Sequence, residues 1–446
     1  MKLTEQHIFK GYWWLPDKPE DKVAGVLTYS PGESILLELI GGFETEEVTI
    51  AGFLDKENNK VALIHGIDSN AMEISMVSCY RSFSYNYRSG FPMMRYSTRM
   101  AIYGKHINSL DEVCDYSAYV RFPELSYWVP PSAIHSVLHY TAEGNEIESC
   151  SFHLPHFDSE TESICSVVCD NGVKISIKKG IGYQTGDLML KPELEQYSYL
   201  EIKKPYAGLC IKDIFHEIHK FSGFLSLATK RNVRPESIYL TDLQIGKDIN
   251  KGKNSYYPPI YILLVQRPVP NPAKLDWNNF LFRYKDVADS IHDILPKWMS
   301  DTDNLQPIKS HLVDSLVYKP IVGSVDFLQV IQAIEGVWWR FRDESYKVAH
   351  SIPKKKKTDL KTILNEVRAS LSTIPTIANT EIDIEAAVDS RVYYTHFVDE
   401  AKRPNRLDGW KLYDLTQKLR DVLLCLVLEL LGLNHKEIDR ILVKSK

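Results

Sequence analysis

The sequence predicts a multidomain α+β protein, with a β-rich sandwich or barrel-like N-terminal region followed by an all-α helical bundle. A chain of 446 residues exceeds the size of a single domain. The period of its apolar residues changes from two to about 3.6 beyond a proline-rich segment. In that segment, Pro268, Pro270 and Pro272 favour an extended linker. We therefore expect domains at residues 1–267 and 274–446, joined by a linker at 268–273.

The N-terminal region is rich in short β-forming segments that lie between turn signals. Asn58-Asn59 and Asp170-Asn171-Gly172 predict hairpin turns. Many short strands at such spacing favour sandwich or barrel-like packing in one or two lobes. The predicted strands are residues 23–29, 35–39, 47–53, 61–65, 74–85, 95–103, 116–122, 134–140, 149–153, 164–169, 173–179, 237–240 and 260–265.

One helix is expected within this β-rich region, at residues 211–227, because apolar residues recur there at steps of three and four. The region is also rich in tyrosine, as at positions 80, 85, 87 and 96. Such tyrosines fit cross-strand packing, and they equally fit a platform that stacks bases or grips a ligand. The sequence leaves both interpretations open.

Beyond the linker, the pattern predicts a bundle of five to seven helices. The first, 277–295, should end or bend at Pro296, and Ser324 should cap the third. Asp408 should cap the longest helix, which carries a continuous leucine-rich face. The other predicted helices are residues 308–317, 324–346, 358–371, 382–397 and 436–443.

Composition and charge narrow the classes of partner. The formal net charge is −5, so any contact with nucleic acid requires a local basic patch. The most apolar run, residues 423–433, is interrupted by Glu429 and is shorter than the ~20 residues that span a bilayer. The N-terminus lacks the apolar core of a signal peptide. We therefore expect a cytoplasmic protein with no membrane contact.

The cysteines fit the same compartment. Seven of them, an odd number, are scattered along the chain, which indicates free thiols in a reducing environment. Cys165 and Cys169 form the only close pair, and no second pair or histidine cluster accompanies them. The sequence also lacks a phosphate-binding glycine loop and an acidic cluster spaced for Mg²⁺. We expect neither a metal nor a cofactor.

The candidate site lies late in the chain, where Arg391 and His396 are separated by four residues. Histidine exchanges a proton near neutral pH, and the planar guanidinium of arginine fits phosphate. These two groups suffice to cleave a phosphodiester without a metal. A pair at this spacing also arises by chance on many helices. Three cations follow the pair within ten residues: Lys402, Arg403 and Arg406.

The segment Ser390-Arg391-Val392-Tyr393-Tyr394-Thr395-His396 resembles the HEPN signature of ApeA-like proteins of bacterial abortive infection. Near the N-terminus, Gly11-Tyr12-Trp13-Trp14-Leu15-Pro16-Asp17 and Gly25-Val26-Leu27-Thr28-Tyr29 resemble the opening of the ApeA-type N-terminal domain. The two matches occur in the order that this family has. They extend the resemblance over nearly the whole chain.

The resemblance implies an anti-phage endoribonuclease, a toxin that cleaves host RNA such as tRNA and leaves a 2′,3′-cyclic phosphate. Arg391 and His396 would be catalytic. Tyr393 or Tyr394 could stack a base or position the histidine, and tyrosine at these positions equally fits packing. Glu335 lies among apolar residues and is either a surface group or a partner of Arg391; ApeA-like sequences often carry a similar glutamate there. The expected partners are RNA, bound at the three cations named above, and a phage-derived trigger at the N-terminal domain.

A homodimer through the HEPN domain is also expected. Five helical steps rotate a side chain by about 140°, so Arg391 and His396 do not share one face of a straight helix. Either the helix frays at its end, or a second subunit completes the site, as HEPN pairing implies. Trp338 and Trp339 are candidates for exposed apolar contacts in that dimer.

Two alternatives remain open at this stage. In the first, the HEPN bundle is not catalytic and binds RNA or a protein, while the β domain acts as a sensor. Val392 favours this alternative, because most HEPN ribonucleases carry a polar residue directly after the arginine. In the second, the β-rich half is the main functional part and binds a sugar or protein ligand.

Overall fold

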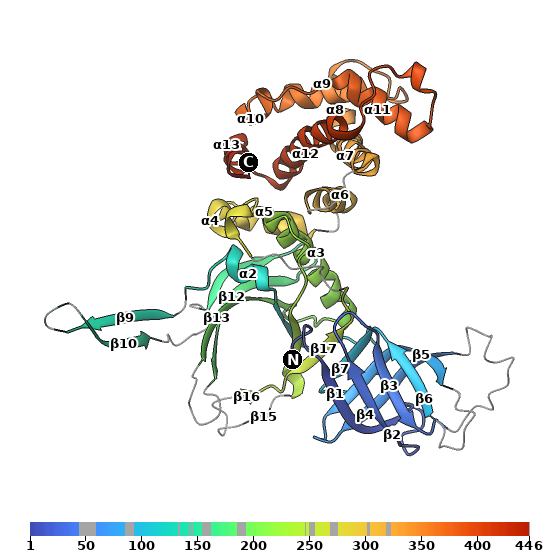
Figure 1. Ribbon diagram of the computed structural model, residues 1–446, viewed down its shortest axis with the longest axis vertical. Coiled ribbons are helices and arrows are strands. Elements are labelled where there is room, and N and C mark those ends of the chain that lie inside the picture. Colours follow the sequence, from blue (N-terminus) through green and yellow to red (C-terminus); the bar gives the residue numbers. More distant parts are fainter. Residues whose placement is uncertain are drawn as a thin grey trace.

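A single antiparallel sheet organises the N-terminal region of the computed structural model (Figure 1). The structure describes residues 1–43, 59–84, 93–132, 134–141, 144, 146–153, 162–184, 193–245, 247–248, 255–267, 275–300, 304–317 and 323–445. Within these residues the sheet holds 13 strands, in the order β11-β12-β13-β8-β14-β17-β7-β5-β4-β1-β2-β3-β6. β6 also pairs with β5, which closes β5, β4, β1, β2, β3 and β6 into a barrel.

The strands of this sheet are short, as the alternating sequence pattern predicts. Their bounds are β1 His7–Trp14, β2 Val23–Tyr29, β3 Ile35–Ile40, β4 Lys60–Asp68, β5 Glu73–Ser84, β6 Met93–Thr98, β7 Met100–Tyr103, β8 Tyr116–Arg121, β11 Ser163–Val168, β12 Lys174–Gln184, β13 Glu193–Lys203, β14 Ser237–Asp242 and β17 Ile260–Leu264. Two separate hairpins pair β9 His135–Tyr140 with β10 Ile147–His153, and β15 Lys247–Asp248 with β16 Ser255–Tyr256.

The barrel is filled by alternate side chains of its strands. Trp13 is fully buried inside it, as are Leu27 and Tyr29 of β2. The Trp13 ring lies directly against Gly66 of β4, where any side chain would collide with the indole. The predicted barrel-like packing is therefore present, in the first of two lobes.

The second lobe is an open sheet covered on one face by the helix α3, Ile211–Thr229. Val120 of β8 stands in register between Leu200 of β13 and Ile238 of β14, and all three are buried. α3 buries the apolar stripe that its sequence predicts, including Phe221 and Leu225. Its predicted range, 211–227, is confirmed to within two residues at the C-terminal end.

The C-terminal region is helical, as predicted, with α12 packed against α6 and α7 at its centre (Figure 1). Asp408 caps α12, also as predicted. The helices beyond residue 283 are α4 Tyr284–Val287, α5 Ile291–Met299, α6 Gln306–Leu316, α7 Ser324–Val337, the π-helical turn Trp338–Arg342, α8 Asp343–Ala349, α9 Leu360–Ser370, α10 Pro375–Ala378, α11 Ile384–His396, α12 Gly409–Leu431 and α13 His435–Ser445.

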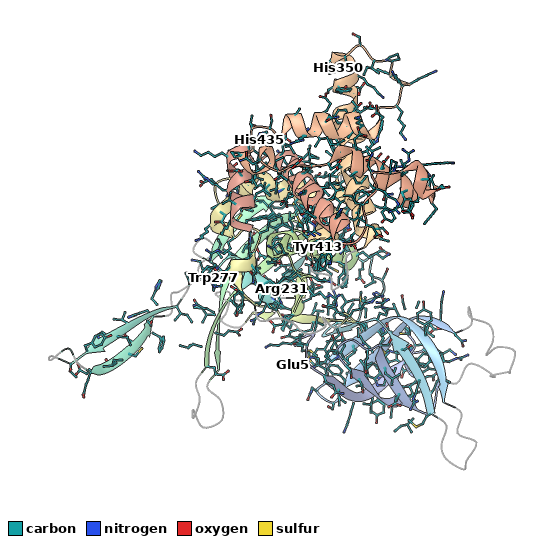
Figure 2. The ribbon with its side chains drawn as sticks, turned by 45° about the horizontal axis from the view of Figure 1, so that its top comes forward. Glu5, Arg231, Trp277, His350, Tyr413 and His435 are labelled. Atoms are coloured by element: carbon teal, nitrogen blue, oxygen red, sulfur yellow. The ribbon has the colours of Figure 1, made fainter. Side chains whose placement is uncertain are left out.

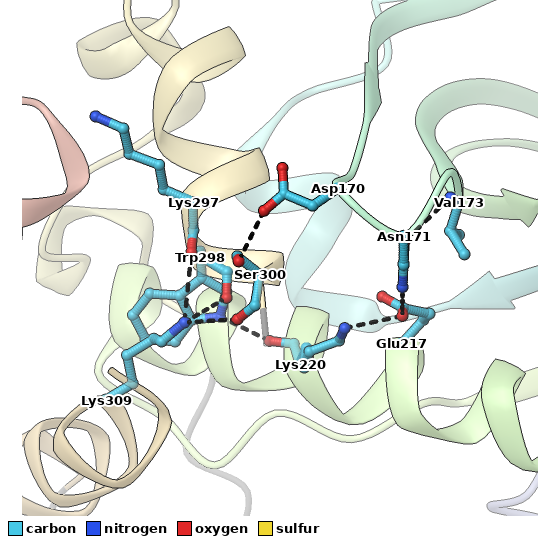
Figure 3. Close-up of polar contacts among 9 residues, drawn as sticks. All are labelled: Asp170, Asn171, Val173, Glu217, Lys220, Lys297, Trp298, Ser300 and Lys309. Carbon is cyan, nitrogen blue, oxygen red and sulfur yellow. Dashed lines mark hydrogen bonds and ion pairs between the residues drawn. The ribbon is translucent and has the colours of Figure 1, made fainter. Parts of the chain in front are cut away.

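A buried polar cluster joins the sheet lobe to the first helices of the C-terminal region (Figure 3). Lys309 of α6 is 1% exposed, and its Nζ donates to the carbonyl oxygen of Trp298 at 2.7 Å, at the C-terminal end of α5. On α3, Lys220 pairs with Glu217 at 2.8 Å, and Glu217 also accepts from Asn171 in the turn between β11 and β12. Buried charges are tolerated when they are paired in this way.

The predicted helix at 277–295 is wrong. In its place are a 3₁₀ turn at Trp277–Asn279, an extended segment, α4 and α5. The backbone N–H groups of Leu281 and Phe282 both donate to the carbonyl oxygen of Ala228, which holds the extended segment against the end of α3. Tertiary hydrogen bonds thus override the helical period, and α5 continues through Pro296 to Met299.

Other differences are smaller. The strands β1 and β13 and the short helix α2, Pro123–Trp128, were not predicted. The N-cap of α7 is Gly323, whose N–H donates to the Asp326 carboxylate, and Ser324 is the first helical residue. The predicted strand at 47–53, residue 58 of the first hairpin turn, the tyrosines at 85 and 87 and the linker at 268–273 lie outside the described residues.

Candidate functional site

The helix α11 carries the motif and is regular to its last residue. Asp383 caps its start by accepting from the N–H of Ala386 at 2.9 Å. His396 is the final helical residue, and Phe397 ends the helix in a left-handed conformation with φ of 50°. The helix therefore does not fray before His396. Arg391 and His396 of one chain consequently point to different sides of the helix.

Arg391 is held by a carboxylate from a neighbouring helix. Its Nη2 lies 3.3 Å from Oε2 of Glu335, near the end of α7. The two side chains are 25% and 16% exposed, so solvent reaches the pair but does not surround it. The structure thus places beside Arg391 the carboxylate that the sequence suggested as its partner, Glu335.

The helical rod changes its geometry three residues after Glu335. A π-helical turn, Trp338–Arg342, connects α7 to α8. Trp338 is 3% exposed and donates to the Asp343 carboxylate at 3.1 Å, and Trp339 is half-buried. The expectation that both tryptophans form an exposed contact surface is therefore wrong, because Trp338 lies four residues after Ile334 and continues the buried face of α7.

The two motif tyrosines serve different contacts. The Tyr394 hydroxyl donates to the carbonyl oxygen of Leu407 at 3.0 Å, and burial raises the pKa of this phenol. Tyr394 therefore stays neutral and fastens the loop that follows α11. The Tyr393 ring stands edge-on to Tyr394, 5.0 Å away, and the Arg406 guanidinium lies 4.7 Å from its centroid.

Two of the three cations in that loop are neutralised within the chain. Arg403 pairs with Asp389 at 3.3 Å, and Arg406 pairs with Glu400. Lys402 is exposed, and no carboxylate of the described residues pairs with it. The structure thus brings the predicted RNA-binding cations to one loop, where only Lys402 carries uncompensated charge.

Sequence reasoning missed the residues that shape this loop. Asp389 accepts from the backbone N–H of Asn405 at 3.1 Å as well as from Arg403, and Ser390 Oγ accepts from the Leu407 N–H at 2.9 Å. Both anchors are buried. The sequence does contain a pattern that could have predicted these anchors. Two small polar residues directly precede Arg391 on the core-facing side of α11, where a polar side chain needs a hydrogen-bond partner.

His396 is exposed, and two large aromatic side chains in the same part of the domain are exposed as well. Phe397, its neighbour, is 88% exposed, and Trp410 at the start of α12 is 84% exposed. Trp410 lines a surface hollow of about 350 Å³ together with Leu407.

The described residues hold no group of three or more histidine, cysteine or acidic side chains that could bind a metal ion. Burial raises the pKa of the Cys165 thiol to about 11, so it is not poised as a thiolate ligand. Among the residues that the structure describes, no helix is long and apolar enough to cross a membrane.

Comparison with known families covers most of the chain. The model of ApeA N-terminal domain 1 matches residues 8–298. The model of the Apea-like HEPN domain matches residues 328–437, a range that contains Glu335, Arg391 and His396. No curated protein and no solved structure matches the chain.

Proposed function

This chain belongs to the ApeA-type family of HEPN proteins, and on that premise we propose that it is a metal-independent endoribonuclease of anti-phage defence. Its activation during infection would cleave host RNA and arrest growth. Structured tRNA loops are suitable targets, because their single-stranded bases can be splayed and bound. The observation that carries the proposal is the Arg391–Glu335 contact, with an exposed His396 five residues further along the same helix, all within the HEPN match.

The proposed reaction is an internal transesterification. The ribose 2′-oxygen attacks the adjacent phosphorus as the bond to the 5′-oxygen breaks, which yields a 2′,3′-cyclic phosphate and a 5′-hydroxyl. His396 takes the 2′-hydroxyl proton or protonates the leaving 5′-oxygen, a role typically worth ~10²–10⁴-fold. Arg391 stabilises the charge that grows on the phosphoryl oxygens. Glu335 fixes the orientation of that guanidinium.

A homodimer would complete the site. Because α11 is regular through His396, one chain does not direct Arg391 and His396 to the same point. A two-fold axis through the HEPN domain would set Arg391 of one chain opposite His396 of the other. The exposed Phe397 and Trp410 supply an apolar surface for that contact. Light scattering should find a dimer, and a monomer that remains fully active would contradict this part of the proposal.

The N-terminal domain would sense infection and restrain the HEPN domain. We propose the division predicted from sequence, residues 1–267 and 274–446, with a phage-derived trigger that binds the first domain. The buried cluster around Lys309 and Lys220 supports a mechanical connection between the two domains, because the Trp298 indole of α5 donates to the Lys220 carbonyl oxygen of α3 at 2.8 Å and Lys309 of α6 donates to Trp298. A rigid connection would transmit a displacement of the sheet lobe to the helices.

Phage challenge tests the function in cells. Strains that express wild type, His396→Ala or Arg391→Ala are infected, and plaque numbers and culture survival are compared at equal protein levels. The proposal expects protection by wild type alone. Equal protection by His396→Ala would remove catalysis at this residue from the mechanism.

A further inference from the structure

We infer that the lysine turn, Lys354 to Lys357 between α8 and α9, is a docking surface for the RNA phosphate backbone, separate from Arg391 and His396. The inference rests on the proposed ribonuclease function and adds to it the place where the substrate is held. Four consecutive lysines are often only a solvated loop. Here the geometry of the turn, its charge and its position each favour a binding role.

The backbone of the lysine turn is fixed. The N–H of Lys356 donates to the carbonyl oxygen of Pro353 at 2.9 Å, which closes the turn. Lys347 of α8 donates to the carbonyl oxygen of Lys354 at 3.1 Å. Just after the turn, the Thr358 hydroxyl donates to the Asp343 carboxylate at 2.9 Å. A ligand therefore meets lysines on a backbone that is already fixed, and binding orders little additional backbone.

The charge of the turn is largely uncompensated. Lys354 pairs with Glu344 at 3.1 Å, but the two side chains are 82% and 79% exposed, so the pair is weak. Lys355 and Lys356 are exposed, and no carboxylate in the described part of the chain pairs with them. Lys357 lies 5.7 Å from the centroid of Trp339, whose ring holds it without neutralising it.

Unlike the lysines of the turn, the arginines near the motif are compensated by carboxylates. Arg391, Arg403 and Arg406 are each paired with a carboxylate of the same chain. A polyanionic substrate gains little long-range attraction from such pairs. In a chain whose net charge is −5, attraction of RNA requires free cations elsewhere, and the lysine turn supplies them.

The position of the turn suits a substrate that also reaches the site. Trp339, which holds Lys357, lies four residues beyond Glu335 on the same helical rod, about 6 Å along its axis. Lys361, in the first turn of α9 that follows the lysine turn, pairs with Glu385 in the first turn of α11. Figure 2 places His350, at the end of α8, at the outer tip of the helical region, away from the sheet lobes. A bulky RNA can approach that tip freely.

The chemistry of the turn favours nucleic acid over an acidic protein. Residues 354–357 present only charge, whereas protein interfaces combine apolar anchors with a polar rim. Ammonium groups act as point charges that follow a phosphate backbone without reading sequence. The lysine turn should therefore contribute affinity that is independent of sequence and sensitive to salt.

The test measures RNA binding by the full-length chain with His396→Ala, so that no substrate is consumed. The probe is a short fluorescein-labelled oligouridylate, titrated at salt concentrations from about 50 to 200 mM. The variant adds Lys355→Gln and Lys356→Gln. Both side chains are exposed, and neither takes part in a hydrogen bond or ion pair with the described residues, so folding should be unaffected. A matched control replaces Lys10 and Lys285, two exposed lysines outside the HEPN match, and removes the same charge.

Each phosphate contact with a single strand contributes about 0.7 to the slope of log affinity against log salt. Losing two contacts should reduce the slope by about 1.4 and weaken binding about 25-fold near 0.1 M salt. The control should match its parent. An unchanged slope in the turn variant, or an equal loss in the control, would overturn the inference. Displacement of the RNA by polyglutamate at equal charge concentration would also overturn it, in favour of an acidic protein.

The outcomes also separate this inference from the proposed function. If wild type cleaves RNA while the turn variant binds normally, the docking surface is wrong and the ribonuclease stands. If binding depends on the turn but wild type cleaves nothing, the ribonuclease is wrong and the docking surface stands. If wild type binds no RNA at all, both are overturned.

Discussion

Replacing Glu335 by glutamine tests how Arg391 is positioned. Glutamine keeps the shape of the side chain and one acceptor oxygen, but it removes the charge that holds the guanidinium at 3.3 Å. If Glu335 orients Arg391 for the transition state, kcat should fall while the affinity for RNA is unchanged or rises, because one negative charge near the substrate is removed. A residue that only stabilises the fold would not produce this division between kcat and KM.

The size of the effect follows from the exposure of the pair. Fully exposed ion pairs contribute about 0 to 1 kcal/mol, and breaking a fully buried pair costs about 3 to 5 kcal/mol. At exposures of 25% and 16%, Arg391 and Glu335 lie between these limits. We take about 1.5 to 2 kcal/mol, which corresponds to a fall in kcat of about 10- to 30-fold.

The assay is cleavage of an RNA oligonucleotide by purified protein under single-turnover and steady-state conditions. The matched control is Glu429→Gln, which breaks the pair with Arg342 in the same domain but outside the motif. We expect normal kcat in this control. Unchanged kcat in Glu335→Gln, or an equal fall in the control, would refute the positioning role.

Three further predictions concern the surroundings of the site. Asp389→Ala removes two hydrogen-bond acceptors of the loop and should lower the free energy of unfolding by about 2 to 3 kcal/mol in urea titrations; a change below about 0.5 kcal/mol would contradict its anchoring role. Burial disfavours ionised Asp343, but hydrogen bonds led by Lys347 outweigh it and lower the pKa of this carboxyl. A carboxyl whose pKa is lower in the folded state stabilises the fold at pH values above its pKa in the unfolded chain. The loss of stability in Asp343→Asn should therefore be full near pH 7 and should shrink as the pH falls below about 4. A loss that does not depend on pH would exclude this linkage. Replacing both Phe397 and Trp410 by serine should raise the dimer dissociation constant at least about tenfold in sedimentation experiments, while the monomer stays folded, because both side chains are exposed in the single chain; unaltered dimerisation would place the interface elsewhere.

Much of the fold follows from the sequence because the apolar periods are strong. The strand β2 was predicted with its observed bounds. Asp408 caps α12, and the apolar stripe of α3 is buried, both as expected. These elements depend on local patterns and on burial of one face. Their bounds therefore need no knowledge of distant contacts.

The errors arise where distant contacts decide the local structure. The segment near Leu281 has a helical period, yet it is extended because its N–H groups bond to Ala228 of another helix. The exposure expected for Trp338 is wrong for another reason, since this residue follows Ile334 by four positions and continues the buried stripe of α7. The closure of the barrel likewise depends on the pairings of β1 with β4 and of β3 with β6, which join strands that are not adjacent in the chain.

The candidate site shows the same division. Residue chemistry and the family resemblance pointed to Arg391, His396 and Glu335, and the structure brings the first and third together. Charge along the sequence did not reveal that Arg403 and Arg406 are already paired, since Asp389 is buried on α11 and Glu400 lies in the loop itself. Which cations are free is a property of the fold.

The most direct test of the central proposal is the chemistry of the RNA ends that the protein produces. Purified wild type is incubated with total tRNA in the presence of EDTA, and the fragments are analysed for their termini beside those from Arg391→Ala and His396→Ala. The proposal predicts fragments with 2′,3′-cyclic phosphate and 5′-hydroxyl ends from wild type, and none above background from either variant. Tight binding without cleavage, or cleavage that persists in both variants, would contradict it and favour a non-catalytic HEPN module.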